Sequence, residues 1–280
     1  MRITVLGLGI IGGVWAAHLA KDGHEVRTWN RTFKPQAPGA TADLVAAVTG
    51  AELVAIVVAD PPAVAEVLAR IAPVLAPGMV VAQHSTVGVE DTRSYAALVA
   101  GRGAAFLDMP FTGSKPAAEQ RQNVFFVGGD PAVLATVAPV YARLAKAVLP
   151  IGAIGQAMAI KLAFNLLIAN LNQAQCEALT LATRAGIPPE TFFAAFDLNV
   201  GRSPLVDLKK PKYLTGDYSP QFSVKHMHKD LRLALAFAGS LGLRLDQTAA
   251  VERAYGEAAA QGRSEQDFAA LLEVVRAAKA

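Results

Sequence analysis

The chain has few of the residues from which disulfides, metal centres and nucleic-acid surfaces are built. Cysteine occurs once in 280 residues, as Cys176, which excludes an intrachain disulfide and a cysteine-cluster metal site. Its apolar neighbours favour a small buried side chain. His226 and His228 are two residues apart and cannot share a helix face, so we expect no metal. The net charge of +3 is scattered, which argues against a nucleic-acid partner.

Long apolar runs are also missing from the sequence. No uninterrupted apolar stretch reaches the roughly 18 residues that a membrane span requires. The N-terminal segment is apolar, but Arg2 is its only basic residue and its glycines do not precede a cleavage site. We therefore expect no signal peptide, no membrane partner and a cytoplasmic location.

Hydrophobic residues make up 53 % of the chain, enough for two domains with sizeable cores. In the first half, short apolar runs alternate with helical patterns, which predicts an α/β fold of the Rossmann type, a doubly wound parallel sheet with helices on both faces. The predicted strands are Arg2–Leu6, Glu25–Trp29, Leu53–Val58, Met79–Gln83, Ala104–Met109 and Val124–Gly129; the predicted helices are Ile11–Asp22, Ala42–Ala47, Pro62–Leu75, Val89–Ala100 and Pro131–Leu144.

The pattern changes near Pro150. A proline-free stretch rich in alanine and leucine follows from Gly155 to Gly186, and only helical patterns come after it. We predict a Rossmann domain over residues 1–154 and an all-helical domain over 155–280, which a long interdomain helix enters.

A glycine-rich turn follows the first predicted strand. Gly7, Gly9 and Gly12 have the spacing of a dinucleotide-binding turn, and the turn opens a predicted helix, which is the context that the motif requires. The first glycine makes the tight turn, the second lets the backbone approach the pyrophosphate, and the third allows close helix packing. The alternative is an ordinary βα turn.

Asn30 and Arg31 follow the second predicted strand, at the place where NAD enzymes usually have an acidic residue. A carboxylate would repel a 2′-phosphate, whereas a guanidinium binds it with two hydrogen bonds. We therefore predict that NADP(H) is preferred over NAD(H). The alternative is that Arg31 is a solvated loop charge.

Two polar groups lie where packing does not explain them. Thr112, Gly113 and Ser114 follow a buried strand and offer a hydroxyl and backbone N–H groups to an anion, although a plain turn would look the same. Lys161 and Asn165 are four residues apart, so they share one face of an apolar helix. The lysine either extends its amine to solvent or takes part in chemistry, and Asn165 favours chemistry.

A third polar group opens another apolar helix. Lys229 and Asp230 precede the run LRLALAFAG, and Phe222 lies shortly before them. On this pattern alone the charged pair is equally well explained as an exposed helix start.

Together these segments resemble the β-hydroxyacid dehydrogenase family, which includes 3-hydroxyisobutyrate and 6-phosphogluconate dehydrogenases. The similarity spans almost the whole chain, and the segment FTGSKPAAE most resembles the glyoxylate and succinic semialdehyde reductase branch. The continuation Gln120–Asn123 departs from the usual Asp-Gly-x-Leu, which bears on the substrate rather than the reaction. Imine-reducing relatives commonly lack the lysine that Lys161 matches.

The resemblance implies a role for each matching residue. Lys161 matches the catalytic lysine, with Asn165 as its partner on the helix. The implied substrate-binding residues are Thr112, Gly113, Ser114, Phe222 and Asp230; the implied cofactor-binding residues are Gly7, Leu8, Gly9, Ile10, Ile11, Gly12, Asn30, Arg31, Thr32, Val58, Ala59, Thr86 and Lys229.

The expected activity is an NADPH-dependent reduction of a small carboxylate-bearing aldehyde or keto acid. Lys161 would donate the proton, and burial on its apolar helix would lower its pKa toward neutrality. The alternatives are a 3-hydroxyisobutyrate-type dehydrogenase working oxidatively, an imine reductase, or a non-catalytic NADP-binding sensor. The long apolar helix leads us to expect a homodimer or homotetramer.

Overall fold

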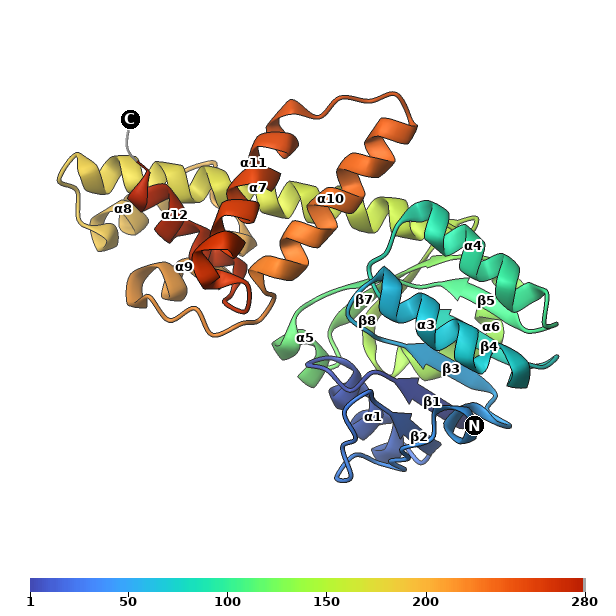
Figure 1. The fold of residues 1–280 in the computed structure, drawn as a ribbon. Helices are drawn as coiled ribbons and strands as arrows, with labels where there is room; N and C mark the ends of the chain where they lie inside the picture. The colour runs from blue at the N-terminus through green and yellow to red at the C-terminus, as the bar shows by residue number, and fades with distance from the viewer. Residues whose placement is uncertain (279–280) are drawn as a thin grey trace. The chain divides into compact units, whose positions relative to one another are not determined.

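The computed structural model describes residues 1–278, which form two compact units that divide between Lys161 and Leu162. The first unit is an α/β fold around one sheet with the strand order β2-β1-β3-β4-β5-β7-β6, and β8 pairs with β7 (Figure 1). The strands are β1 (Arg2–Leu6), β2 (Glu25–Trp29), β3 (Leu53–Ile56), β4 (Val80–Gln83), β5 (Ala105–Asp108), β6 (Phe111–Thr112), β7 (Asn123–Gly128) and β8 (Ala145–Gly152).

Helices connect these strands, as the alternating pattern predicts. Asp60 and Asp130 are the N-cap residues of α3 and α6, because each carboxylate accepts a backbone N–H of the first helical turn and a proline follows each. The helices of this unit are α1 (Gly12–Lys21), α2 (Leu44–Val48), α3 (Pro61–Ile71), α4 (Val89–Ala100), α5 (Lys115–Glu119) and α6 (Pro131–Ala142), with a 3₁₀ turn at Ala72–Val74.

The predicted parallel sheet is confirmed, with one antiparallel interruption. Strands β2, β1, β3, β4 and β5 are parallel, but β7 runs antiparallel to β5 and β6. A parallel connection needs a crossover, usually a full helix. Here β6 follows β5 after two residues and itself pairs with β7, and α5 has only five residues, so the chain turns back.

The second unit contains only helices among the residues described, which confirms the predicted fold class. The long predicted helix is α7, and it begins in the first unit and continues into the second. The helices are α7 (Gln156–Arg184), α8 (Pro189–Phe196), α9 (Pro204–Thr215), α10 (Val224–Ser240), α11 (Asp246–Ala258) and α12 (Leu271–Ala277), with short turns at Ala259–Arg263 and Phe268–Ala270. Within the described part of the chain, no helix is long and apolar enough to cross a membrane.

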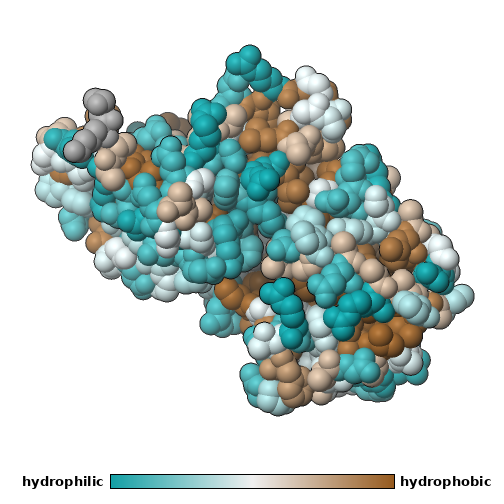
Figure 2. Space-filling model, in the orientation of Figure 1, coloured by the Kyte–Doolittle hydropathy of each residue, from teal (hydrophilic) through white to brown (hydrophobic). Residues whose placement is uncertain are grey.

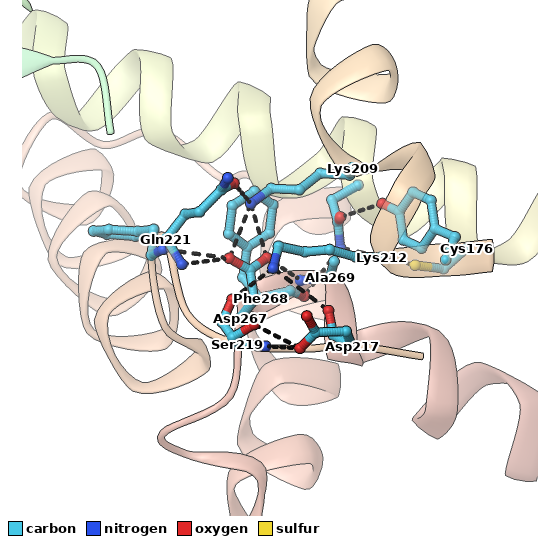
Figure 3. A network of polar contacts seen from close by, with 12 residues as sticks. Cys176, Lys209, Lys212, Asp217, Ser219, Gln221, Asp267, Phe268 and Ala269 are labelled. Carbon is cyan, nitrogen blue, oxygen red and sulfur yellow. Dashed lines mark hydrogen bonds and ion pairs between the residues drawn. The ribbon is translucent and has the colours of Figure 1, made fainter. Parts of the chain in front are cut away.

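A buried ion pair ties the core of the second unit together. The amine of Lys209 is 2.8 Å from one carboxylate oxygen of Asp267, and both side chains are at most 1 % exposed (Figure 3). The other oxygen of Asp267 accepts the backbone N–H of Gln221 at 2.9 Å. Desolvation lowers the pKa of Lys209, while the nearby carboxylate opposes that shift. The pair thereby joins α9 to the segment that precedes α10.

The single cysteine and one more buried amide also serve this core. Cys176 is fully buried, as its apolar surroundings predict, and burial raises the pKa of its thiol. Asn172, which lies on the same helix, accepts the hydroxyl of Tyr213 at 2.6 Å and donates to Tyr255 at 3.0 Å. These residues are structural. The face of the molecule drawn in Figure 2 is mostly hydrophilic, with apolar residues scattered over it.

Candidate active site

The glycine turn lies between β1 and α1, at the carboxyl edge of the parallel strands. Gly7 has a φ of +102°, and a side chain there would overlap the carbonyl oxygen of Val57. A side chain on Gly12 would overlap the carbonyl oxygen of Gly7. At Gly9, by contrast, an added Cβ meets no atom within 4 Å. The fold therefore needs the first and third glycines, whereas the second leaves open space in front of the helix N-terminus, which fits a pyrophosphate.

The end of β2 braces this turn. The side-chain oxygen of Asn30 accepts the backbone N–H of Leu8 at 2.9 Å, and its amide donates to the carbonyl of Thr32 at 2.7 Å. Arg31 is exposed beside them. The amine of Lys34 donates to the carbonyl of Leu8 at 2.7 Å, which places a second positive charge at the turn. Sequence reasoning missed Lys34, because a lysine in a loop carries no pattern.

The ends of β3 and β4 lie side by side in the sheet. The hydroxyl of Ser85 accepts the backbone N–H of Val58 at 2.9 Å and so links the two strand ends. Ala59 and Thr86, the other residues expected near the cofactor here, follow directly and are not buried. Three of the residues expected at the cofactor thus lie in neighbouring loops at one edge of the sheet.

The predicted substrate loop begins at β6, which includes Thr112. Gly113 has a φ of +109°, and a Cβ there would come within 2.6 Å of the Asn123 amide nitrogen, so this position requires glycine. Ser114 precedes the first turn of α5. The amine of Lys161 lies 5.9 Å from the ring centroid of Phe111, the residue just before Thr112. The structure therefore brings the predicted catalytic lysine next to the strand that leads into the predicted anion loop.

The start of α7, five residues before Lys161, rests on a buried carboxylate. Asp108 is fully buried at the end of β5, and its Oδ2 accepts the backbone N–H groups of Gly155 at 2.9 Å and Met158 at 3.0 Å. Burial raises the pKa of Asp108 to about 6, although these N–H groups favour the charged form. Asp108 thus fixes the turn from which the lysine helix begins.

In the second unit, three of the predicted residues form one cluster. The amide of Asn165 donates to Oδ2 of Asp230 at 2.6 Å, and the amine of Lys229 lies 2.6 Å from Oδ1 of the same carboxylate. Asp230 is 1 % exposed and Asn165 is 4 % exposed. Asp230 is therefore not an exposed helix start: it joins α10 to α7. Phe222, just before α10, lies 5.7 Å from the ring of His226.

Neither of the two neighbouring histidines takes part in a metal cluster. His226 contacts the hydroxyl of Ser223 at 2.8 Å, and His228 lies 2.8 Å from a carboxylate oxygen of Glu252. Over residues 1–278, no group of three or more histidine, cysteine or acidic side chains is placed to hold a metal ion.

Comparison with known families accounts for both units. Residues 2–155 match the model of the NAD-binding domain of 6-phosphogluconate dehydrogenase, and residues 155–275 match the NAD-binding model of NADP-dependent 3-hydroxyisobutyrate dehydrogenase. The chain belongs to the 3-hydroxyisobutyrate and 6-phosphogluconate dehydrogenase family. As a member of this family it is an NAD(P)-dependent oxidoreductase that acts on hydroxyl or carbonyl groups.

Individual relatives cover the whole chain. It is 29 % identical over 285 residues to glyoxylate/succinic semialdehyde reductase 1 of Arabidopsis thaliana, covering 99 % of each protein. It is 29 % identical to 2-hydroxy-3-oxopropionate reductase of Escherichia coli, covering 98 % and 97 %. Among solved structures, Mycobacterium tuberculosis 3-hydroxyisobutyrate dehydrogenase with L-serine is similar at a TM-score of 0.88 and 26 % identity, covering 99 % of both chains.

Proposed function

We propose that this oxidoreductase uses NADPH to reduce the carbonyl group of a small carboxylate-bearing aldehyde or keto acid, of the glyoxylate or succinic semialdehyde type. The observation that carries the proposal is the position of the Lys161 amine, 5.9 Å from the Phe111 ring at the entrance to the Thr112–Ser114 loop. The Lys161 cation, the Thr112–Ser114 loop and the glycine turn all belong to the first unit. The similarity to the two reductases supports the substrate class.

When bound, the reduced nicotinamide supplies a hydride to the carbonyl carbon. The carbonyl π electrons then move to the oxygen, which becomes negative and needs a proton. Lys161, as an ammonium, stabilises this charge and transfers a proton to the oxygen, leaving a neutral amine that solvent reprotonates. In the reverse direction the neutral amine removes the hydroxyl proton. No other side chain is required for this proton balance.

The loop and the helix orient the substrate for that step. The hydroxyl of Thr112 and the N–H groups of Gly113 and Ser114 are suited to a carboxylate, since such a turn presents several donors to one anion. Asn165 lies one helical turn from Lys161. Because Asp230 holds the nitrogen of its amide at 2.6 Å, the amide has one orientation in which to meet the lysine or the substrate. On the resemblance, we assign Phe222 to substrate binding and Lys229 to cofactor binding.

The coenzyme preference rests on two cations near the glycine turn. Arg31 is exposed at the end of β2, and Lys34 is held on the carbonyl of Leu8 at 2.7 Å. No carboxylate occupies the position of Asn30, whose oxygen is already used by the N–H of Leu8. A 2′-phosphate would therefore meet positive charge and no repulsion.

Arg31→Ala tests this preference. Hydrogen bonds to charged groups contribute about 1.5–3 kcal/mol, so the ratio of NADPH to NADH affinity should fall at least about tenfold. Dissociation constants for both coenzymes measure it by fluorescence titration, with Arg102→Ala, an exposed arginine after α4, as the control. An unchanged ratio would refute the assignment of Arg31.

The likeness to 3-hydroxyisobutyrate dehydrogenase supports a second candidate, oxidation of a 3-hydroxy acid on the same residues. Assays of glyoxylate, succinic semialdehyde, 3-hydroxyisobutyrate and a cyclic imine with both coenzymes distinguish the candidates. We expect the first two to be reduced with the highest kcat/KM. Faster oxidation of 3-hydroxyisobutyrate would favour the second candidate, and faster imine reduction would contradict both.

We also propose that the protein forms a homodimer or homotetramer through α7. Phe164, Leu167 and Leu171 follow one another at helical spacing and remain 40 %, 52 % and 41 % exposed. An apolar stripe of this kind is usually covered in an oligomer. The molar mass in solution, measured by light scattering, tests this proposal, and a monomer at micromolar concentration would contradict it.

A further inference from the structure

A buried amide lies under the predicted substrate loop. Asn123 is the first residue of β7 and is fully buried. Its amide nitrogen donates to the carbonyls of Thr112 and Gly113, at 3.3 Å each. Its oxygen accepts the indole N–H of Trp15 at 3.0 Å. The side chain of Asn123 therefore connects the loop to Trp15, which lies 108 positions before Asn123 in the sequence.

The far end of this connection lies on the cofactor helix. Trp15 is in the first turn of α1, three residues after Gly12, and is 1 % exposed. Its ring packs edge-on against Phe111, with centroids 4.9 Å apart, and at a tilt against Phe125, with centroids 5.0 Å apart. The indole thus holds the strand leading into the loop by packing, and holds Asn123 by a hydrogen bond.

The loop and the amide fit each other closely. Gly113 has a positive φ, and a Cβ on it would lie 2.6 Å from the Asn123 nitrogen and 2.9 Å from the Ala117 methyl group. The loop backbone therefore lies directly against the amide. A buried amide is costly unless it is hydrogen-bonded, and an apolar side chain of similar size would pack at this site without that cost. The hydrogen bonds of Asn123 to the loop carbonyls and to Trp15 explain why a polar residue lies here.

We infer that Asn123 is a positioning residue: it orients the Thr112–Ser114 loop for the substrate carboxylate and, through Trp15, couples that loop to the cofactor helix. The inference rests on the proposed function for the identity of the ligand. Asn123 is fully buried, so we assign it no contact with substrate or cofactor. It holds two loop carbonyls, which sets the direction of the adjoining N–H groups and of the Thr112 hydroxyl. Occupation of the glycine turn then steadies the loop through α1.

Two variants separate the parts of this connection. Asn123→Leu removes both sets of hydrogen bonds while keeping the number and branching of the side-chain heavy atoms, and Trp15→Phe removes the indole donor while keeping an aromatic ring. Trp29→Phe is the matched control, because its indole N–H bonds to the carbonyl of Ala42 at 3.2 Å, away from the loop. Trp15→Phe keeps the test decisive if Asn123→Leu does not fold.

The first readout is amide hydrogen exchange of residues 113–118 in the coenzyme-free protein. We expect exchange to rise about tenfold in Asn123→Leu and about threefold in Trp15→Phe, with no change in Trp29→Phe. Added NADPH should slow this exchange in the wild type but should no longer slow it in Asn123→Leu or Trp15→Phe. A general loss of stability would instead raise exchange throughout the sheet, including β1 and β3.

The second readout separates KM from kcat. Asn123→Leu should raise the KM of the carboxylate substrate about tenfold and change the NADPH dissociation constant less than threefold. The double variant that combines Trp15→Phe with Asn123→Leu should have a KM little higher than that of Asn123→Leu alone. Unchanged exchange at residues 113–118, or an unchanged KM, would overturn the inference. The exchange arm needs no substrate. Faster loop exchange in Asn123→Leu, with no turnover of any compound by the wild type, would support the connection while refuting the proposed function.

Discussion

Replacing Gly9 and Gly12 separately by alanine distinguishes the glycine that the coenzyme needs from one that the fold needs. At Gly12 the new methyl group would overlap the Gly7 carbonyl oxygen and lie 3.4 Å from Cβ of Val57. The overlapping atom belongs to the backbone and cannot rotate away. Overpacking of this kind typically costs 1–3 kcal/mol, so we expect the free energy of unfolding to fall by about 3 kcal/mol.

Gly9→Ala should behave in the opposite way. No atom lies within 4 Å of the new methyl group, and the backbone there is outside the left-handed region. The free energy of unfolding should therefore change by less than about 1 kcal/mol in either direction. The methyl group would instead occupy the space that the pyrophosphate requires, so NADPH affinity should fall at least about tenfold, or about 1.4 kcal/mol.

Urea unfolding followed by circular dichroism measures the first quantity for both variants, and NADPH fluorescence titration measures the second for Gly9→Ala. Two results would refute the reasoning. One is a Gly9→Ala protein that is destabilised as much as Gly12→Ala. The other is a Gly9→Ala protein that binds NADPH as tightly as the wild type.

Two further predictions concern stability. Burial raises the pKa of Asp108 from 3.8 to about 6, so between these pH values the folded protein holds a proton that the unfolded chain releases. This group should therefore lower the free energy of unfolding by about 3 kcal/mol as pH rises from about 4 to about 6. Urea unfolding across this range should show a smaller fall in that free energy for Asp108→Asn, and an identical pH dependence would contradict the account. Lys209→Met leaves Asp267 buried without its cation and should lower the free energy of unfolding by about 3–5 kcal/mol. Lys210→Met breaks a partly exposed pair with Asp197 and should lower it by less than about 1 kcal/mol. Equal losses in urea unfolding would show that burial does not decide the difference.

Local patterns predicted most of the fold. The strands Arg2–Leu6 and Glu25–Trp29 and the helix Val89–Ala100 match the structure to the residue, since each combines a clear apolar pattern with defined ends. Strand β8 was not predicted, because Lys146 and Pro150 interrupt its apolar run and much of it is exposed. Helix α9 was not predicted, because prolines both begin it and interrupt it and its apolar residues do not form a regular stripe.

The site could be predicted only where a motif or resemblance marks it. The glycine turn and Lys161 belong to recognisable segments. Lys34 and Asn123 do not, because their importance comes from contacts with Leu8 and Trp15, which the sequence separates by 26 and 108 positions. Such pairings depend on the order of strands in the sheet. The antiparallel placement of β7, which brings Asn123 under the loop, was itself not predicted.

The most direct test of the central proposal is turnover by Lys161→Ala, measured together with its NADPH affinity. If Lys161 donates the proton, kcat with glyoxylate or succinic semialdehyde should fall about 10²–10⁴-fold. NADPH should still bind within about threefold of the wild type, because a change of that size is below about 0.7 kcal/mol. Unchanged kcat in a variant that still binds NADPH would contradict the assignment of Lys161 and the mechanism built on it.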